Sequence, residues 1–280
     1  MMPERRMLAP KPFAMADAIS KYRSPEVIDV MRVAAFGARM ELLGSYEEKA
    51  GATRFAALDA AEAYYAMLVS LAVESIAGVA RDEAPVRVLD IGAGTGRVAY
   101  DVARSEPVHE VIAVEQSPEL VNEIRLVASG VRREVSVPVT ARQRMRAILR
   151  LPGPAPKLTV RLGDAHDVPA ETASFTCACG FGLLDRVERP RAVVAELARV
   201  LKPGGVAIVS CLNDFSGGPA SEQEWLDQAA DAFTGSAWES VATRRQQLVL
   251  RQNAKWAETF EADIVVATRS GLPMPAAAPT

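Results

Sequence analysis

The feature that most constrains this chain is a run of β-branched residues that stops at three closely spaced glycines. Val86 to Ile91 is typical of a short buried strand, and Gly92, Gly94 and Gly96 follow it directly. Residues 97–104 are then apolar at helical spacing. Glycine suits such a turn because the backbone takes open dihedrals and approaches a ligand without an intervening Cβ. Together with the free N–H groups of the helix start, this pattern predicts a nucleotide-binding βαβ unit.

An acidic residue at the expected distance strengthens this prediction. The strand at 111–114 ends in Glu115, 19 residues after Gly96. A carboxylate at the tip of the neighbouring strand suits the two hydroxyls of a ribose. The glycines are spaced GxGxG and not GxGxxG, which argues against a dinucleotide enzyme. A nicotinamide-dependent oxidoreductase is nevertheless the first alternative.

Three further motifs follow in order. A strand at 158–162 ends in Gly163-Asp164-Ala165, a fourth strand spans about 173–182, and the turn at 201–205 reads Leu-Lys-Pro-Gly-Gly before a fifth strand. With the glycine turn, the stretch from Val86 to Arg269 resembles the class I S-adenosylmethionine (SAM) dependent methyltransferases. The resemblance implies a Rossmann-like, doubly wound α/β sheet of seven strands, mostly parallel with an antiparallel last strand. It also implies SAM as the cofactor.

Ligands of open α/β sheets lie at the carboxyl ends of the strands, and the resemblance assigns parts of SAM to these ends. The glycine turn would follow the methionine part, Glu115 would hold the ribose, and Asp164 with the Ala165 N–H would hold the adenine. The implied cofactor-binding residues are Asp90, Gly92, Ala93, Gly94, Gly96, Glu115, Gln116, Gly163, Asp164, Ala165, Cys179 and Gly180.

The expected reaction is methyl transfer to an O, N, C or S acceptor of a small molecule or modified peptide. Positioning alone can supply about 7–11 kcal/mol of such a barrier, so a base is not strictly required. Many small-molecule methyltransferases that the chain resembles have a histidine pair after the fourth strand, where this chain has Gly182-Leu-Leu-Asp185. Asp185 is therefore the candidate catalytic base, with capping of the next helix as its alternative role. His166 is a second candidate base, although a solvent-facing loop position also explains it. The missing histidine pair leaves a non-catalytic SAM-binding protein as the second alternative.

The three cysteines, an odd number, favour a reducing cytoplasm over a disulfide scaffold. Cys177 and Cys179 resemble in position the cysteines of arsenite methyltransferases that bind arsenic. We expect their thiols to face opposite sides of the strand, and the N-terminal region has no cysteine. No metal site is therefore predicted, and the cysteines are interpreted as small buried hydrophobic residues.

Helices are expected before the first strand. Ser24-Pro25-Glu26 combines a cap, a first-position proline and an acid, and the helix is expected to continue towards Gly44. A second helix is expected from about Thr53 to Val79. We expect residues 1–83 to form an N-terminal arm and helical cap that packs on the sheet. In the resembling family such helices also cover the cofactor. Residues 84–270 are predicted to form the SAM-binding domain, and 271–280 a flexible tail.

An inserted basic segment lies between Asn122 and Arg161, where nine basic residues stand against two acids. Residues 140–151 predict a short basic helix, within an insertion at about 129–157. In a helix, Arg142, Arg146 and Arg150 would fall close to one face. The segment is either a solvated surface or a docking face for an acidic partner: a substrate, a carrier domain or a peptide.

The remaining predictions concern the C-terminal part and the partners. Residues 221–247 are expected to be mostly helical, and a strand pair at 247–250 and 262–267 to close the sheet. The net charge of −3 argues against general nucleic-acid binding. No apolar run of membrane-span length is identified, and no membrane association is expected. These observations favour a cytoplasmic enzyme.

Overall fold

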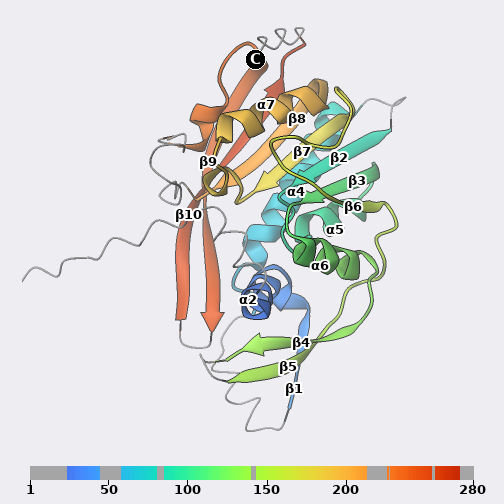
Figure 1. Ribbon diagram of the computed structural model, residues 1–280, viewed down its shortest axis with the longest axis vertical. Helices are drawn as coiled ribbons and strands as arrows, with labels where there is room; N and C mark the ends of the chain where they lie inside the picture. The colour runs from blue at the N-terminus through green and yellow to red at the C-terminus, as the bar shows by residue number, and fades with distance from the viewer. Residues whose placement is uncertain are drawn as a thin grey trace, which may run out of the picture.

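A seven-stranded sheet forms the centre of the protein (Figure 1). The computed structural model describes residues 24–44, 58–80, 85–139, 143–212, 226, 228–253 and 256–271. In spatial order the strands are β6 (Leu158–Leu162), β3 (Val108–Glu115), β2 (Val86–Ile91), β7 (Phe175–Phe181), β8 (Leu201–Cys211), β10 (Trp256–Arg269) and β9 (Trp238–Asn253). The first five run parallel, and β10 is antiparallel to both its neighbours. The expected Rossmann-like sheet with an antiparallel last strand is confirmed.

The central strands of this sheet are buried on both faces, because their side chains alternate between two cores. Val86 and Val88 of β2 face a core that includes α4 (Glu62–Val79) and α5 (Arg97–Ala103). Leu89 and Ile91 face the opposite core, which includes α7 (Pro190–Val200). A strand buried on both faces explains why 86–91 is almost continuously apolar in the sequence.

α4 is long and apolar enough to cross a membrane, judged by length and composition alone, and it is the one such helix in the described ranges. Glu62 and Glu74 lie within this helix, so it is not the uninterrupted apolar run that the sequence prediction considered. The core helix of a soluble protein passes the same test. In this structure Leu68, Ala72 and Ile76 of α4 are fully buried, and the helix contacts α5, β7 and β8.

The first predicted helix is confirmed but is shorter than expected. α2 (Pro25–Phe36) does not continue to Gly44. A 3-10 turn, η1 (Gly37–Arg39), and strand β1 (Met40–Leu43) follow instead. Gly37 packs so tightly on the chain at 58 that an added Cβ would lie 1.6 Å from the Leu58 carbonyl oxygen. The second predicted helix is confirmed from residue 62, and its expected start at 53–57 lies outside the described residues.

The basic insertion forms strands, so the prediction of a basic helix was wrong. β4 (Arg133–Pro138) and β5 (Arg144–Leu149) form an antiparallel hairpin, and β1 pairs with the other edge of β5. The apolar residues of β5 have a period of two, because Ala147 and Leu149 are buried while Arg144 and Arg146 are exposed. That period is typical of a strand with one buried face. Arg142, at the expected helix face, lies outside the described residues.

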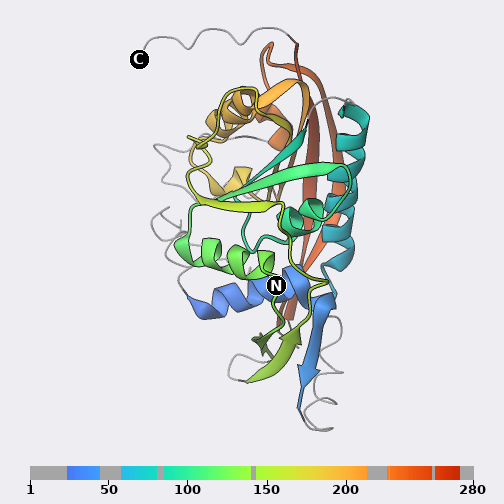
Figure 2. The same cartoon turned by 90° about the vertical axis from the view of Figure 1, so that its right-hand side faces the viewer.

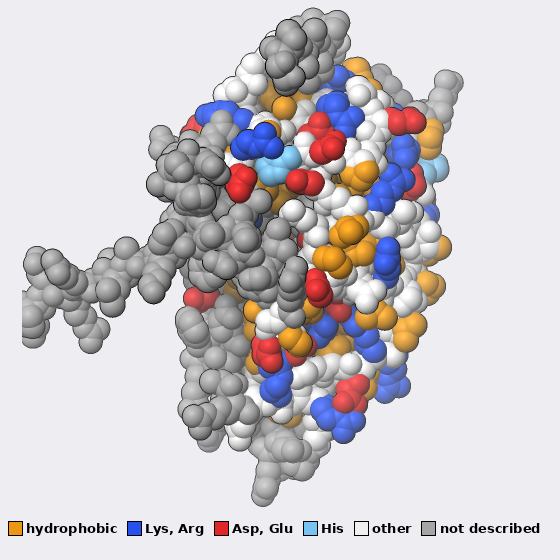
Figure 3. All heavy atoms as spheres, in the orientation of Figure 1, with side chains coloured by type: hydrophobic (Ala, Val, Ile, Leu, Met, Phe, Trp, Pro, Cys, Tyr) orange, Lys and Arg blue, Asp and Glu red, His pale blue; other side chains and the backbone are white. Residues whose placement is uncertain are grey.

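The arginines of this small sheet pair with acids of the same chain. Arg144 contacts Asp29 of α2, Arg146 contacts Glu134 of β4, and Arg150 lies 2.6 Å from Glu41 of β1. Figure 3 shows basic and acidic side chains next to one another over this end of the molecule. These ion pairs balance much of the positive charge, and docking of an acidic partner stays a prediction.

The C-terminal part differs from the helical prediction for 221–247. A short 3-10 turn, η3 (Ala229–Ala232), precedes β9, which already begins at Trp238. β9 pairs along almost all of β10, so the predicted strand pair is confirmed and is longer than expected. This pairing is a tertiary contact that local sequence does not reveal. Residues 221–225 and 227 lie outside the described residues, as does the expected tail beyond Gly271.

A buried arginine joins both N-terminal helices to the helix that follows the glycine turn. The Arg97 side chain of α5 is only 3% exposed. Its guanidinium donates twice to the Glu62 carboxylate of α4, at 2.7 Å each, and once to Asp101 at 2.7 Å. It also donates to the Ala35 carbonyl at the end of α2. Arg39 adds a second cation to Asp101 at 2.6 Å.

We predict that Arg97→Met lowers the free energy of unfolding by about 1–3 kcal/mol, because the partly exposed acids Glu62 and Asp101 lose this cation and the Ala35 carbonyl loses its donor. Denaturant unfolding measures this change. Arg146→Met is the matched control. Arg146 is 71% exposed and pairs with one acid, so its loss should cost less than about 1 kcal/mol. Equal effects of the two substitutions would contradict the assigned role of Arg97.

Candidate functional site

The glycine turn is fastened to the end of β3 by backbone hydrogen bonds. Gly92 and Ala93 donate their N–H groups to the Val114 carbonyl at 2.8 and 3.3 Å. Gly92, Gly94 and Gly96 have φ values of +62°, +57° and +81°, a region that side-chain-bearing residues rarely adopt. The sequence prediction of a tight glycine turn between strand and helix is therefore confirmed.

The glycines differ in what surrounds them. A Cβ at Gly92 would lie 2.7 Å from the Leu183 side chain, and one at Gly96 would lie 2.8 Å from a side chain of α6 (Pro118–Ala128). At Gly94 the nearest atom would be the Met31 methyl carbon of α2, at 3.6 Å. Gly92 and Gly96 thus permit close packing. Among the described residues, a Cβ at Gly94 would meet only the Met31 methyl carbon within 4 Å, which marks the space expected for the ligand.

Glu115 lies beside this space with its carboxylate held by the backbone. Oε2 accepts the Gly94 N–H at 2.9 Å, and Oε1 accepts the N–H groups of Gln116 and Ser117 at 2.8 and 3.0 Å. Burial raises the pKa of Glu115, and these three N–H donors oppose that rise. A carboxylate has about four acceptor sites, so a ribose hydroxyl still finds a place. The residue fits the role that the resemblance implies.

Asp90 lies at the end of β2, just before the turn, and is buried. Burial raises the pKa of Asp90 to about 7, and the nearby charge of Glu115 adds to this rise. A hydrogen bond from the Ala99 N–H acts in the opposite direction. The side chain is therefore partly protonated at neutral pH. A carboxyl in this state acts as a hydrogen-bond donor as well as an acceptor.

The loop after β6 carries the residues predicted to hold adenine. Asp164 Oδ1 accepts the His166 N–H at 2.9 Å and lies 2.8 Å from His166 Nδ1. Burial alone would raise the pKa of Asp164, but the His166 contacts outweigh it and lower that pKa. The His166 side chain is only 10% exposed, so the expectation of a solvent-facing histidine was wrong. Among the described residues, both of these contacts to Asp164 use Oδ1. Oδ2 is therefore the oxygen that would accept the adenine amino group.

Asp185 lies at the carboxyl end of β7, in the 3-10 turn η2 (Leu184–Arg186), and is 3% exposed. It does not cap the next helix, because the cap position of α7 is Arg189. The charge of Asp185 acts on the buried Tyr64 of α4, whose hydroxyl is hydrogen-bonded to Ser210 at the end of β8. Burial, with smaller contributions from neighbouring charges, raises the pKa of Tyr64 to about 12, so the phenol is neutral.

Ser210 connects this cluster to the turn region. Its Oγ and carbonyl oxygen accept the Gly182 N–H at 3.0 and 2.8 Å. Leu183, the next residue, packs on Gly92 of the glycine turn. Asp185 therefore lies two residues from a side chain that contacts the expected cofactor position. The sequence prediction named Asp185 but missed Tyr64 and Ser210, because the contact between α4 and β8 leaves no local signal.

The cysteine prediction was wrong on geometry. Residues two apart in a strand share one face, and the Sγ atoms of Cys177 and Cys179 lie 3.9 Å apart in the core. Both thiols and Cys211 are free and buried. The described residues contain no cluster of three or more His, Cys, Asp or Glu side chains that would hold a metal ion. The Cys179 thiol faces this core, and its cofactor contact stays a prediction.

The predicted cofactor residues come from the ends of four adjacent strands, β6, β3, β2 and β7, in the order of the sheet. Asp90, the glycine turn and Glu115 with Gln116 lie together through the bonds described above. The Gly163 N–H donates to the Glu115 carbonyl at 3.1 Å, which brings the adenine loop to the same edge. Gly180 packs on Ile91 and Leu183. Their individual roles in binding stay predictions.

Comparison with known proteins identifies the domain. Residues 89–209 match a family model described as a methyltransferase domain. The chain is 32% identical over 133 residues to a ubiquinone biosynthesis O-methyltransferase of Xanthomonas oryzae pv. oryzae, which covers 47% of this chain and 45% of the relative. The chain thus spans about half the length of the curated relatives it matches.

Two solved structures show the same fold over nearly the whole chain. Magnesium protoporphyrin IX methyltransferase from Synechocystis PCC 6803, with bound SAM, has a TM-score of 0.55 at 14% identity and covers 94% of this chain and 100% of its own. The cyclase SpnF has a TM-score of 0.54 at 15% identity and covers 93% and 98%. Because a cyclase shares the fold, the fold alone does not specify the reaction.

The family match, the order of the motifs and the geometry of the turn agree. Residues 89–209 therefore match a methyltransferase domain, and the fold around them is that of the SAM-dependent class I type. The residues present fit that cofactor, since Gly94 leaves a space that a Cβ would narrow and a buried carboxylate lies beside it. The nicotinamide-dependent alternative is not supported.

We predict that Gly94→Val abolishes binding of SAM and of its product S-adenosylhomocysteine (SAH). The new side chain occupies the ligand space and is strained at positive φ. Titration calorimetry measures binding, and circular dichroism checks that the sheet is intact. Binding that survives in the folded variant would place the ligand away from this turn.

The raised pKa of Asp90 predicts a pH effect on stability. The unfolded chain loses this proton near the ordinary value of 3.8, whereas the folded chain keeps it until about pH 7. Folding therefore takes up a proton between these values, and the free energy of unfolding falls as the pH rises through them. Asp90→Asn has no carboxyl proton to lose at this position. The free energy of unfolding of the variant, minus that of the unaltered protein, should therefore rise from pH 4 to pH 7. Urea unfolding without cofactor, at several pH values, tests the trend, and a constant difference would contradict it.

Proposed function

We propose that this protein transfers the methyl group of SAM to an oxygen atom of a small molecule. The observation that carries the proposal is the buried carboxylate of Asp185, placed two residues from the Leu183 side chain that packs on the glycine turn. A hydroxyl acceptor must lose a proton, and a positioned carboxylate can take it. The relative from Xanthomonas oryzae is named as an O-methyltransferase, which supports the choice of oxygen.

In the proposed mechanism the bound cofactor supplies a methyl group on a sulfonium, which is already activated for displacement. The residues of this chain orient the partners. The glycine turn and Glu115 would hold the cofactor, and the end of β7 would place the acceptor beside it. Asp185 would take the proton of the acceptor hydroxyl, and the cofactor would leave as S-adenosylhomocysteine. Burial of this region excludes water, which strengthens the interactions of its charges.

Tyr64 and Ser210 help to position the acceptor end of the site. The neutral Tyr64 phenol is hydrogen-bonded to Ser210, and Ser210 in turn accepts the Gly182 N–H. The chain between Gly182 and Asp185 is therefore held to α4 as well as to β8. The three cysteines are free and buried, which supports a location in the reducing cytoplasm.

We predict that the purified protein forms SAH from SAM when offered hydroxylated small molecules, and that Asp185→Asn lowers kcat by about 10²–10⁴-fold. SAH is quantified by mass spectrometry across a panel of hydroxyl, amine, thiol and carbon acceptors. Turnover restricted to amines or thiols would contradict the oxygen assignment. Binding of SAH without turnover on any class would favour a non-catalytic SAM-binding protein.

SAH binding by Asp185→Asn serves as the control, because it separates a role in proton transfer from a role in holding the cofactor. Asp185→Asn keeps the shape of the side chain and removes its charge, so calorimetry should show SAH binding within about threefold of the unaltered protein. A variant that loses SAH affinity together with activity would make Asp185 a cofactor residue and not the base.

A further inference from the structure

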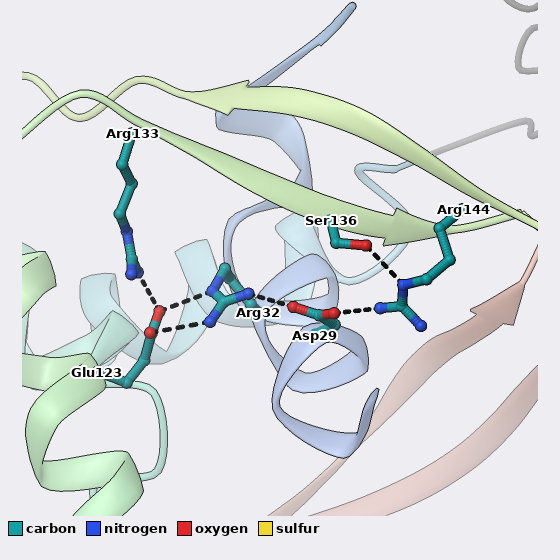
Figure 4. A network of polar contacts seen from close by, with 6 residues as sticks. All are labelled: Asp29, Arg32, Glu123, Arg133, Ser136 and Arg144. Atoms are coloured by element: carbon teal, nitrogen blue, oxygen red, sulfur yellow. Dashed lines mark hydrogen bonds and ion pairs between the residues drawn. The ribbon is translucent and has the colours of Figure 1, made fainter. Parts of the chain in front are cut away.

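A network of charged side chains joins α2 to α6 and to the inserted hairpin (Figure 4). Its inner acid is Glu123 of α6, which is only 4% exposed. Arg32 of α2 donates to both Glu123 oxygens, from Nε at 2.8 Å and from Nη2 at 3.0 Å. Arg133, at the start of β4, donates to the same carboxylate. One buried acid thus joins the cofactor domain, the N-terminal helix and the inserted hairpin.

The outer half of the network continues along α2. The second amino group of Arg32, Nη1, donates to Asp29, one turn earlier in the helix. The other Asp29 oxygen accepts from Arg144 of β5. Arg144 also donates to Ser136 of β4 at 2.5 Å. Charges of alternating sign therefore run from α6 across α2 to both strands of the hairpin, as Figure 4 shows.

The charges compensate one another. Burial alone would raise the pKa of Glu123, but the hydrogen bonds and charges of Arg32 and Arg133 outweigh it and lower this pKa below its ordinary value. The Glu123 carboxylate is therefore ionised at neutral pH. A buried ionised acid constrains its cations strongly, because leaving it unpaired would be costly. This constraint fixes the position of Arg32 and, with it, of α2.

The position of α2 matters because of the residue next to Arg32. Met31 lies over the glycine turn, with its methyl carbon 3.6 Å from the place of a Cβ on Gly94. Figures 1 and 2 both show α2 between the main domain and the small sheet. The helix contacts β4, β9 and α4. The inserted hairpin therefore packs on α2 and is joined to α6 by Arg133.

We propose that Arg32, Glu123 and Asp29 are positioning residues for cofactor binding, and that the inserted β4–β5 hairpin is a brace that keeps Met31 over the cofactor. The hairpin thus has a role inside the molecule that its arginine content alone does not reveal. This inference rests on the proposed use of SAM. It adds that the affinity for SAM and SAH depends on ion pairs that do not contact the ligand themselves and act through Met31.

The test compares SAH binding in Arg32→Met with that of the unaltered protein. When a binding-competent arrangement is populated in only a tenth of the molecules, the apparent Kd rises about tenfold. We expect a rise of this size, with most of it in a faster SAH dissociation measured by stopped flow. Arg32→Lys can pair with one acid, so it should restore part of the affinity. Asp29→Asn leaves the Arg32–Glu123 pair in place and provides a milder variant if Arg32→Met does not fold.

The decisive readout is whether Arg32 acts through Met31. In a Met31→Ala background, Arg32→Met should change SAH affinity by less than about twofold, because the side chain that it positions is already gone. If the fold-changes in SAH Kd caused by Met31→Ala and Arg32→Met simply multiply in the double variant, the two residues act independently and the proposal is overturned. The matched control is Arg146→Met, on the same hairpin but paired only within it, which should leave SAH binding unchanged.

Other outcomes separate this proposal from the proposed function. A lower melting temperature of Arg32→Met with unchanged SAH affinity and dissociation would overturn the positioning role. Loss of affinity in Arg146→Met as large as in Arg32→Met would also overturn it. A chain that binds SAH as predicted but methylates no acceptor contradicts the proposed function alone. No SAH binding by the unaltered protein would overturn both.

Discussion

The structure depends most on the burial of one cation, Arg97, at the first turn of the helix behind the glycines. Its guanidinium touches Glu62, Asp101 and the Ala35 carbonyl, and so contacts three helices at once. A buried guanidinium is tolerated only when its donors are satisfied in fixed geometry. The glycine turn ends at the preceding residue, Gly96. The same side chain therefore sets where α2 and α4 lie relative to the ligand space.

The carboxyl ends of the strands gather three acids with different surroundings. Asp90 is buried and has a pKa of about 7. Glu115 is equally close to the turn but is held by three backbone N–H groups. Asp185 lies at the carboxyl end of β7, and its charge acts on the neutral Tyr64. A sulfonium cofactor carries a positive charge, and an edge lined by acids attracts it electrostatically. The protonation and hydrogen bonding of these acids therefore differ because their surroundings differ, although all three are carboxylic acids.

The sequence predicted the sheet and the glycine turn because these depend on local patterns. Gly92 to Gly96 and Glu115 are close in sequence and are placed by the strands that precede them. The prediction failed where long-range contacts decide the structure. Residues 144–149 are strands because β1 and β4 pair with them, and 238–247 because β10 runs alongside. Likewise, Met31 and Tyr64 reach the site from helices whose docking depends on Arg97 and Glu123, and their own sequence context gives no indication of it.

The bonds between the glycine turn and the end of β3 have a thermodynamic consequence. Val114 and Glu115 accept the N–H groups of Gly92, Ala93 and Gly94, so hydrogen bonds within the chain itself hold this turn. The loss of backbone entropy in this turn is therefore incurred during folding, and ligand association does not incur it again. A preorganised cradle of this kind makes affinity depend on the contacts formed and less on ordering. In this protein, the stability of the sheet and the strength of cofactor binding are thus linked through the same few hydrogen bonds.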